Sequence, residues 1–165
     1  MLRSLIIIVI SLLTGCASVD VTNENFSKNI SGVCLETTDQ VDVIAVRGLD
    51  KERVLKFTSN YLILSGKNEN HRFKKRGTRV KELEFGTKLK ITKIIDYPYG
   101  SSGHCWVVKA KIYDSELIDK SVELPSCWVW DEPIWVAPKS PHEISKGNFN
   151  LDFSTKYLKG SSGCT

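Results

Sequence analysis

The sequence predicts a mainly β, disulfide-bonded domain, and two observations lead to this fold class. Several segments alternate apolar with polar residues and are rich in β-branched residues, which is the pattern of half-buried strands. Four of the five cysteines lie after residue 31, and an even number of cysteines in an exported domain indicates disulfides. The chain has 165 residues, and even the 150 that remain after the apolar N-terminal segment, residues 1–15, are enough for one domain.

The strand signals run from residue 33 to residue 136. Leu89 and Ile91 alternate with polar residues at 88, 90 and 92, which predicts one buried and one solvated face. The alternation shifts by one residue at 93–95, which indicates a β-bulge, and Gly86 allows a sharp turn before this strand. Residues 148–158 are expected to form either an edge strand or a helical turn. The expected strands are 33–35, 41–46, 54–59, 61–65, 88–92, 106–112, 121–124 and 128–136, the last broken at Pro133.

The first 16 residues resemble a bacterial lipoprotein signal. Arg3 precedes an apolar run from Leu5 to Leu12, which suits a secretory signal and is shorter than the roughly 20 residues that a bilayer requires. The run is followed by Leu13-Thr14-Gly15-Cys16, which is similar to the lipobox of that family. The resemblance implies cleavage between Gly15 and Cys16 and a lipid on the Cys16 sulfur. The alternative is an ordinary secretory peptide that happens to end near a cysteine.

The lipobox resemblance also implies a location and a domain layout. Ala17 follows the cysteine, and by the family's sorting rule the absence of aspartate there implies the outer membrane, with the protein lipid-anchored and facing the periplasm. Residues 1–15 are then the signal peptide. Residues 16–31 are polar and lack a period, so we expect a flexible tether, and residues 32–165 are expected to form a single β-rich globular domain.

The cysteines of the expected domain indicate two disulfides. Successive members lie 71, 22 and 37 positions apart, unlike zinc sites, which usually pair their ligands at short spacing. Four cysteines allow three connectivities. If the strand that ends at Ile112 turns back at about residue 120, Cys105 lies opposite Cys127 within disulfide distance, and the other pair follows by elimination. The expected pairs are Cys105–Cys127 and Cys34–Cys164.

Residues 83–130 carry a second resemblance, to bacterial SH3-like domains. It rests on Leu83-x-Phe85-Gly86-Thr87-x-Leu89-x-Ile91, on Trp106-Val107 and on Trp128-Val129. It implies a small, partly open β-barrel and a binding role, often to cell-wall material such as peptidoglycan. Residues 33–80 are longer than the first strand and loop of that family, and 133–164 have no counterpart there. No ligand residue is carried over.

A basic segment between residues 67 and 81 suggests a surface for anions. With a signal peptide present, nucleic acid is excluded as its partner, which leaves lipid phosphates or peptidoglycan carboxylates. The alternative is a solvated loop between strands. The candidate residues for an anionic ligand are Arg72, Lys74, Lys75 and Arg76.

The sequence does not indicate an enzyme, a metal site or a cofactor. His71, His104 and His142 are the only histidines, and none has the helical spacing of a metalloprotease. Net charge is +4, and it falls to +3 without Arg3, which weighs against an inhibitor of strongly basic lysozymes. A further set of aromatic residues could line a groove for a peptide or glycan, or form the core: Tyr97, Tyr99, Trp106, Trp128, Trp130 and Trp135.

These observations predict a lipid-anchored envelope lipoprotein that acts as a binding or structural module. Its expected partners are the membrane, through the N-terminal lipid, and peptidoglycan or an envelope protein. The alternative is an immunity or inhibitor protein against an envelope-targeting toxin or hydrolase, for which a small disulfide-bonded lipoprotein is a natural vehicle. An envelope enzyme is the third hypothesis.

Overall fold

The computed structural model describes residues 18–49, 57–67, 69, 74, 77–100, 103–113, 116–118, 120–126, 134–138 and 149–164, and they confirm the mainly β class. Its elements are β1 (Val19–Asp20), the 3-10 helix η1 (Asn25–Ser27), β2 (Cys34–Thr37), β3 (Val41–Leu49), β4 (Phe57–Gly66), β5 (Thr78–Leu83), β6 (Lys88–Gly100), β7 (Gly103–Ile112), β8 (Ser121–Leu124), β9 (Val136–Pro138), β10 (Leu151–Phe153) and β11 (Leu158–Gly160).

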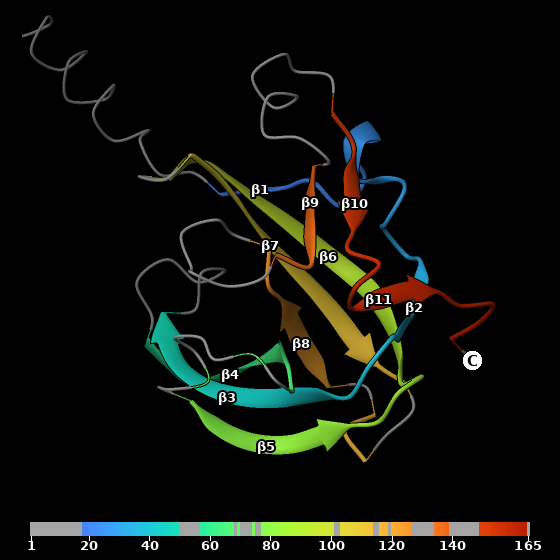
Figure 1. The fold of residues 1–165 in the computed structure, drawn as a ribbon. Helices are drawn as coiled ribbons and strands as arrows, with labels where there is room; N and C mark the ends of the chain where they lie inside the picture. The colour runs from blue at the N-terminus through green and yellow to red at the C-terminus, as the bar shows by residue number, and fades with distance from the viewer. Residues whose placement is uncertain are drawn as a thin grey trace, which may run out of the picture.

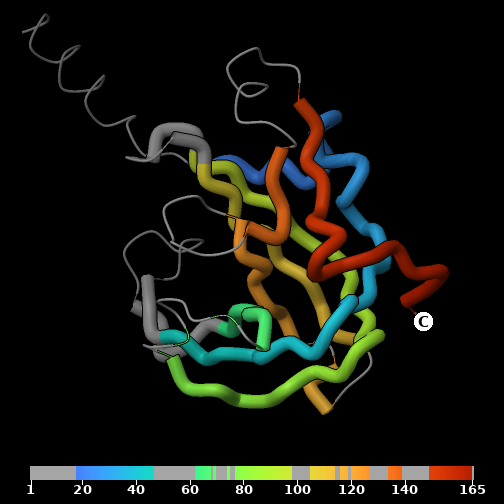
Figure 2. Tube along the Cα trace, viewed as in Figure 1, coloured from blue at the N-terminus to red at the C-terminus, as the bar shows by residue number. Residues whose placement is uncertain are grey.

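Nine strands form one open sheet. Its order is β11-β2-β6-β7-β8-β4-β3-β5, with β1 also paired to β6, and β9 and β10 form a separate two-stranded sheet. Neighbours in the large sheet are antiparallel except β4 and β8, which pair in parallel at Ile63 and Glu123. β3 and β5 run across the lower part of the molecule, and β6 and β7 run obliquely above them, so the sheet is strongly bent (Figures 1 and 2).

The predicted buried face of residues 88–92 is confirmed. Leu89 and Ile91 are at most 1% exposed, and they join Val108 and Ala110 of β7 in the main hydrophobic cluster. The register of β6 against β7 shifts after Ile91, close to the point where the sequence pattern changes phase. Burial of each large apolar side chain stabilises the fold by roughly 1.5–3 kcal/mol.

Two buried threonines join the bent parts of the sheet. Thr37 ends β2, and its hydroxyl donates to the Glu84 carbonyl at 2.9 Å and accepts from the Thr87 amide at 3.2 Å. The backbones of both segments are also paired, because the Gly86 amide donates to the Thr37 carbonyl at 2.9 Å. Gly86 has φ of 79°, a conformation that favours glycine, so the predicted turn before β6 is confirmed.

Residues 18–31 differ from the flexible tether that we expected for 16–31. β1 pairs with β6 through Val19 and Asp96 and through Asp20 and Ile95. Ile30 is fully buried and belongs to the main cluster. This structure could not be predicted from the sequence, because the segment is polar and its few apolar side chains follow no local period. They pack instead in the main cluster with residues that are distant in the chain.

The predicted Cys34–Cys164 disulfide is confirmed. The two Cα atoms lie 5.5 Å apart and 130 positions apart in sequence. The bond joins β2 to the segment that follows β11, so it closes nearly the whole domain into one loop. Cys105 is also disulfide-bonded, but Cys127 lies outside the described residues, so the Cys105–Cys127 pairing stays a prediction.

The C-terminal segment resolves the alternatives left by the sequence. Residues 151–160 form two short strands, β10 and β11, separated by a turn, rather than a helical turn. β11 extends the large sheet by pairing with β2. In the preceding part of the chain, the described residues of the two strands expected at 54–59 and 61–65 form a single strand, β4. The expected basic loop, 67–81, contains the beginning of β5.

Candidate functional site

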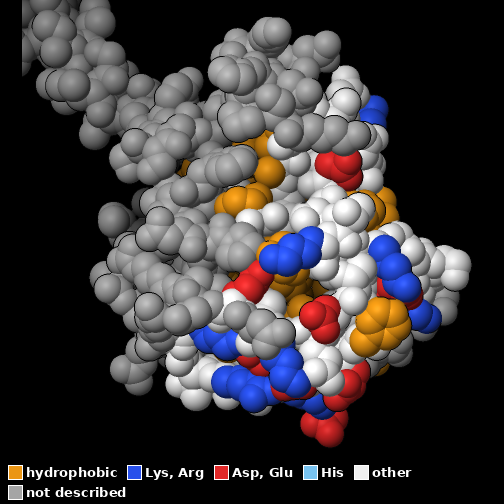
Figure 3. All heavy atoms as spheres, viewed as in Figure 1, with side chains coloured by type: hydrophobic (Ala, Val, Ile, Leu, Met, Phe, Trp, Pro, Cys, Tyr) orange, Lys and Arg blue, Asp and Glu red, His pale blue; other side chains and the backbone are white. Residues whose placement is uncertain are grey.

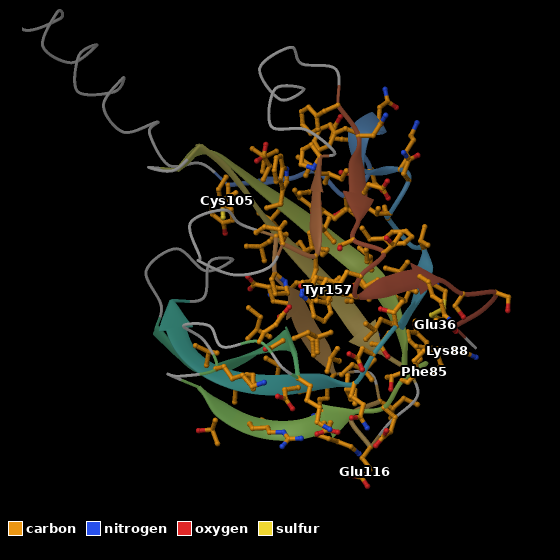
Figure 4. The ribbon with its side chains drawn as sticks, viewed as in Figure 1. Glu36, Phe85, Lys88, Cys105, Glu116 and Tyr157 are labelled. Atoms are coloured by element: carbon orange, nitrogen blue, oxygen red, sulfur yellow. A yellow bond between two sulfur atoms is a disulfide. The ribbon has the colours of Figure 1, made fainter. Side chains whose placement is uncertain are left out.

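A small pocket with a polar network lies between the end of β4 and the turn that precedes β11. It has a volume of about 240 Å³ and is lined by Asp39, Gln40, Val41, Gly66, Lys67, Glu69, Lys156 and Tyr157. Near the centre of the view in Figure 3, hydrophobic atoms lie in a hollow with acidic and basic side chains around it, in the area where Figure 4 labels Tyr157.

Glu69, Tyr157 and Lys156 form the centre of this network. The Tyr157 hydroxyl donates to a Glu69 carboxylate oxygen, and the Lys156 ammonium donates to the Tyr157 hydroxyl at 2.6 Å. The Lys156 ammonium also lies 3.5 Å from that carboxylate. Charges of both signs therefore meet at a single phenol.

The position of Tyr157 depends on the core beneath it. Its ring stacks flat on the fully buried Trp135, with the ring centroids 4.7 Å apart and an interplanar angle of 2°. The Lys156 ammonium lies 4.7 Å from the centre of the Tyr157 ring, within range of a cation–π contact. The aromatic core thus fixes the phenol at the base of the pocket.

Gly66 allows Glu69 to fold back over the end of β4. The Gly66 amide donates to the Glu69 carboxylate at 3.0 Å. A Cβ atom on residue 66 would come within 2.7 Å of that carboxylate, closer than real Cβ contacts, so a side chain here would displace Glu69. This contact could not be predicted from the sequence, because it forms in a polar turn without a hydrophobic period.

The hydrogen bonds of the network hold Tyr157 and Lys156 in their protonated forms. Burial raises the pKa of Tyr157, and its hydrogen bond to Glu69 raises that pKa further. The hydrogen bond to Tyr157 also raises the pKa of Lys156. The phenol therefore keeps its proton and the amine keeps its charge, whereas an activated nucleophile requires a lowered pKa.

Lys67 forms the rim of the pocket. Its ammonium donates to the Gln40 amide oxygen at 2.5 Å and to the Glu82 carboxylate at 2.9 Å. The hydrogen bond from Lys67 lowers the pKa of Glu82. The rim is thus a network of paired charges, and a polar ligand would compete with these internal contacts.

A second surface, the lysine face, lies on the solvated side of β6 and β7. It consists of Lys88, Lys90, Lys93, Lys109 and Lys111. Lys90 lies directly opposite Lys111, and Lys93 lies directly opposite Lys109. These opposed pairs gather positive charge on one side of the sheet. Three acidic residues adjoin this face. Glu36 lies opposite Lys88, Glu123 lies opposite Lys109, and the Asp20 carboxylate lies 3.9 Å from the Lys93 ammonium.

Phe85 is the most exposed large apolar residue of the described chain, with 63% of its surface accessible. The Lys159 ammonium lies 5.0 Å from the centre of its ring and 2.7 Å from the Glu36 carboxylate. The hydrogen bond to Lys159 lowers the pKa of Glu36. Phe85, Glu36 and Lys88 lie close together in Figure 4, at the corner before β6.

The structure gives Lys74, the described member of the expected anionic-ligand patch, an internal role. Its ammonium lies 2.7 Å from the carboxylate of Asp42, whose side chain is 3% exposed. It also donates to the carbonyl groups of Gly66, at 3.2 Å, and of Lys67. Arg72, Lys75 and Arg76 lie outside the described residues, so the patch as a whole stays a prediction.

The aromatic residues fall into three groups: core positions, the half-buried Tyr97 of β6, and positions outside the described residues. Trp106 and Trp135 are fully buried, so they belong to the core rather than to a groove. Trp128 and Trp130 lie outside the described residues, as do the side chain of Tyr99 and those of His71, His104 and His142. In the part of the chain that the structure describes, no group of three His, Cys, Asp or Glu residues could hold a metal ion.

Comparison with known proteins found no matching family model, no similar curated protein and no similar solved structure. Within the described ranges, no helix has the length and apolar character needed to cross a membrane.

Proposed function

We propose that this protein is a lipid-anchored binding module of the bacterial cell envelope, held at the outer membrane and facing the periplasm. The observation that carries the proposal is the lipobox-like Leu13-Thr14-Gly15-Cys16 at the end of a short apolar signal. Acyl chains on Cys16 would hold the domain on the bilayer, since each buried CH₂ contributes about 0.8 kcal/mol.

The disulfide between Cys34 and Cys164 supports an exported location. Thiols of cytosolic proteins are kept reduced, whereas disulfides persist in the periplasm. The bond joins distant parts of the chain with ordinary Cα spacing, and Cys105 is bonded as well. A domain built around such bonds suits an oxidising compartment.

The bent, open sheet supports a binding role. We propose that its SH3-like segment, 83–130, presents the surface through which the domain binds. The lysine face is the preferred contact, because its opposed lysines and the net charge of +3 after removal of Arg3 favour an anionic partner. Peptidoglycan carboxylates and phosphate groups of lipids share this chemistry.

Replacement of the cysteine tests the anchor. Cys16→Ser should move the protein from the membrane fraction to the soluble fraction, while Ala17→Ser, the matched control, should stay with the outer membrane. Ala17→Asp should redirect the protein to the inner membrane by the family's sorting rule. Membrane retention of Cys16→Ser would contradict the proposal.

A crosslink in intact cells, followed by purification of the lipidated protein and mass spectrometry, tests the binding role. Recovery of wall fragments and abundant porins supports a general envelope module. One protein recovered in near-equal amount would instead select the immunity or inhibitor hypothesis.

A further inference from the structure

The chain is fixed to the folded domain immediately after the proposed lipid site. The Val21 amide donates to the Ile94 carbonyl at 2.9 Å, next to the two β1 pairs with β6. The Thr22 hydroxyl accepts from the Ile94 amide at 2.9 Å, and it donates to the Asp20 carboxylate at 2.6 Å. Val21 itself is 5% exposed. These contacts attach the chain to β6 from residue 19 onward.

Only two residues separate Cys16 from this attachment. A chain spans at most about 3.3–3.6 Å per residue, so the Cys16 Cα lies within roughly 11 Å of the Val19 Cα. A domain of this size has a radius of gyration of about 15 Å. The link is therefore shorter than the domain, and the domain cannot turn an arbitrary side to the bilayer.

The direction of β1 shows which end faces the membrane. β1 runs antiparallel to β6, so toward its beginning at Val19 the chain approaches the last part of β6. Figure 1 shows the blue start of β1 beside that part of the strand. Tyr97, the residue after the Asp96 that pairs with Val19, lies there and pairs with Cys105 of β7. Tyrosine is enriched at membrane–water interfaces because its apolar ring carries a polar group.

We infer that the beginning of β1 and the adjoining part of β6 around Asp96 and Tyr97 form a surface that rests on the headgroups of the bilayer that holds the lipid anchor. The inference rests on the proposed function, because it requires acylation of Cys16. It adds an orientation: the beginning of β1 faces lipid, and β5, which lies at the other end of the molecule in Figure 1, faces away.

Two exposed valines allow a matched measurement of this orientation. Val19 on β1 is 50% exposed, and Val80 on β5 is 48% exposed. Each is replaced, one at a time, by a fluorescent amino acid in the full, lipidated chain. The proteins are placed in vesicles of phosphatidylethanolamine and phosphatidylglycerol, some of whose headgroups carry a nitroxide quencher. Mass spectrometry of the Cys16 peptide first establishes acylation.

We expect several-fold stronger quenching at position 19 than at position 80. A flexible Gly–Ser spacer of about 20 residues after Ala17, with an r.m.s. span of roughly 25 Å, should reduce quenching at position 19 to the level at position 80. Equal quenching at both positions in the acylated protein without the spacer would overturn the orientation and leave the anchor intact. An unmodified Cys16 would overturn the anchor and the orientation together.

Discussion

At the residue scale, Lys74, a member of the expected anion-binding patch, forms an internal ion pair with Asp42. Lys74 neutralises Asp42, a carboxylate with 3% of its side chain exposed, and Arg79 approaches the same carboxylate at 2.7 Å. A buried carboxylate needs such partners because its transfer from water is costly. The positive charge of this segment is visible in the sequence. The pairing of Lys74 with Asp42 of β3 is not, because it forms only in the folded chain.

Lys74→Met tests this internal role. The change leaves the Asp42 carboxylate with one cation fewer, so we expect the free energy of unfolding to fall by about 1–3 kcal/mol. Lys28→Met, at an exposed position after η1, is the control and should change stability by less than about 0.5 kcal/mol. Denaturant unfolding measures both variants. Equal stability of Lys74→Met and the wild type would return Lys74 to the candidates for ligand binding.

Tyr157→Phe tests the proton held at the base of the pocket. Because burial raises the Tyr157 pKa, the proton stabilises the fold fully below the pKa of an unfolded tyrosine, about 10, and this contribution is lost as pH rises through the folded pKa. The variant keeps the stack on Trp135 but loses the hydrogen bond to Glu69, at a cost of about 1–2 kcal/mol at neutral pH. Unfolding measured between neutral pH and about pH 11 should therefore show a weaker alkaline loss of stability in the variant than in the wild type. Parallel curves would contradict the role of the phenol proton.

At the scale of elements, the corner between the two parts of the sheet depends on side-chain hydroxyls. Thr37 is fully buried, and its hydroxyl satisfies the amide of Thr87 while donating to the carbonyl of Glu84. The Thr87 hydroxyl donates to the same carbonyl at 2.7 Å. Threonine is therefore used here as a connector between backbones, which its β propensity alone does not reveal.

Thr37→Val keeps the shape of the side chain and removes its hydroxyl. The Thr87 amide then keeps only its 3.2 Å bond to the Glu84 carbonyl, so we expect a loss of about 0.5–1.5 kcal/mol in the free energy of unfolding, the usual net contribution of a hydrogen bond. Thr92→Val is the matched control, because Thr92 is exposed and its hydroxyl donates only a long bond, 3.3 Å, to Lys109. Hydrogen exchange at the Thr87 amide should rise in the first variant alone. A similar effect of both substitutions would contradict the special role of the corner.

The central strands could be predicted from sequence, whereas β1 and the edge strand β5 could not. Leu89 and Ile91 revealed β6 because a strand with one buried face repeats every two residues. β1 has only two residues, and its pairing is made by contacts with residues more than 70 positions away, so no local period exists. The pocket was missed for the same reason, since Glu69 and Tyr157 meet only in the folded chain.

At the scale of the whole molecule, the Cys34–Cys164 disulfide closes almost the entire domain. In the chain-entropy model, a loop of more than 100 residues is stabilised by nearly 5 kcal/mol, and measured losses for native disulfides are about 2–5 kcal/mol. The double variant Cys34→Ser, Cys164→Ser should therefore unfold at a lower denaturant concentration. Thiol counting should find both cysteines bonded in the wild type. An unchanged unfolding midpoint would show that the packing of β11 on β2 suffices to hold the ends.

Lys90→Glu tests binding through the lysine face. The substitution places a carboxylate directly opposite Lys111 on the solvated side of the sheet, and we expect the free energy of unfolding to change by less than about 0.5 kcal/mol. Binding to peptidoglycan or to anionic vesicles should weaken, and it should become less sensitive to salt, because fewer positive charges meet the partner. Lys28→Glu makes the same change in net charge away from the face, so it controls for long-range attraction. If both variants weaken binding equally, only the net charge matters. A loss confined to Lys90→Glu, in a protein about as stable as the wild type, would identify the face itself as the contact.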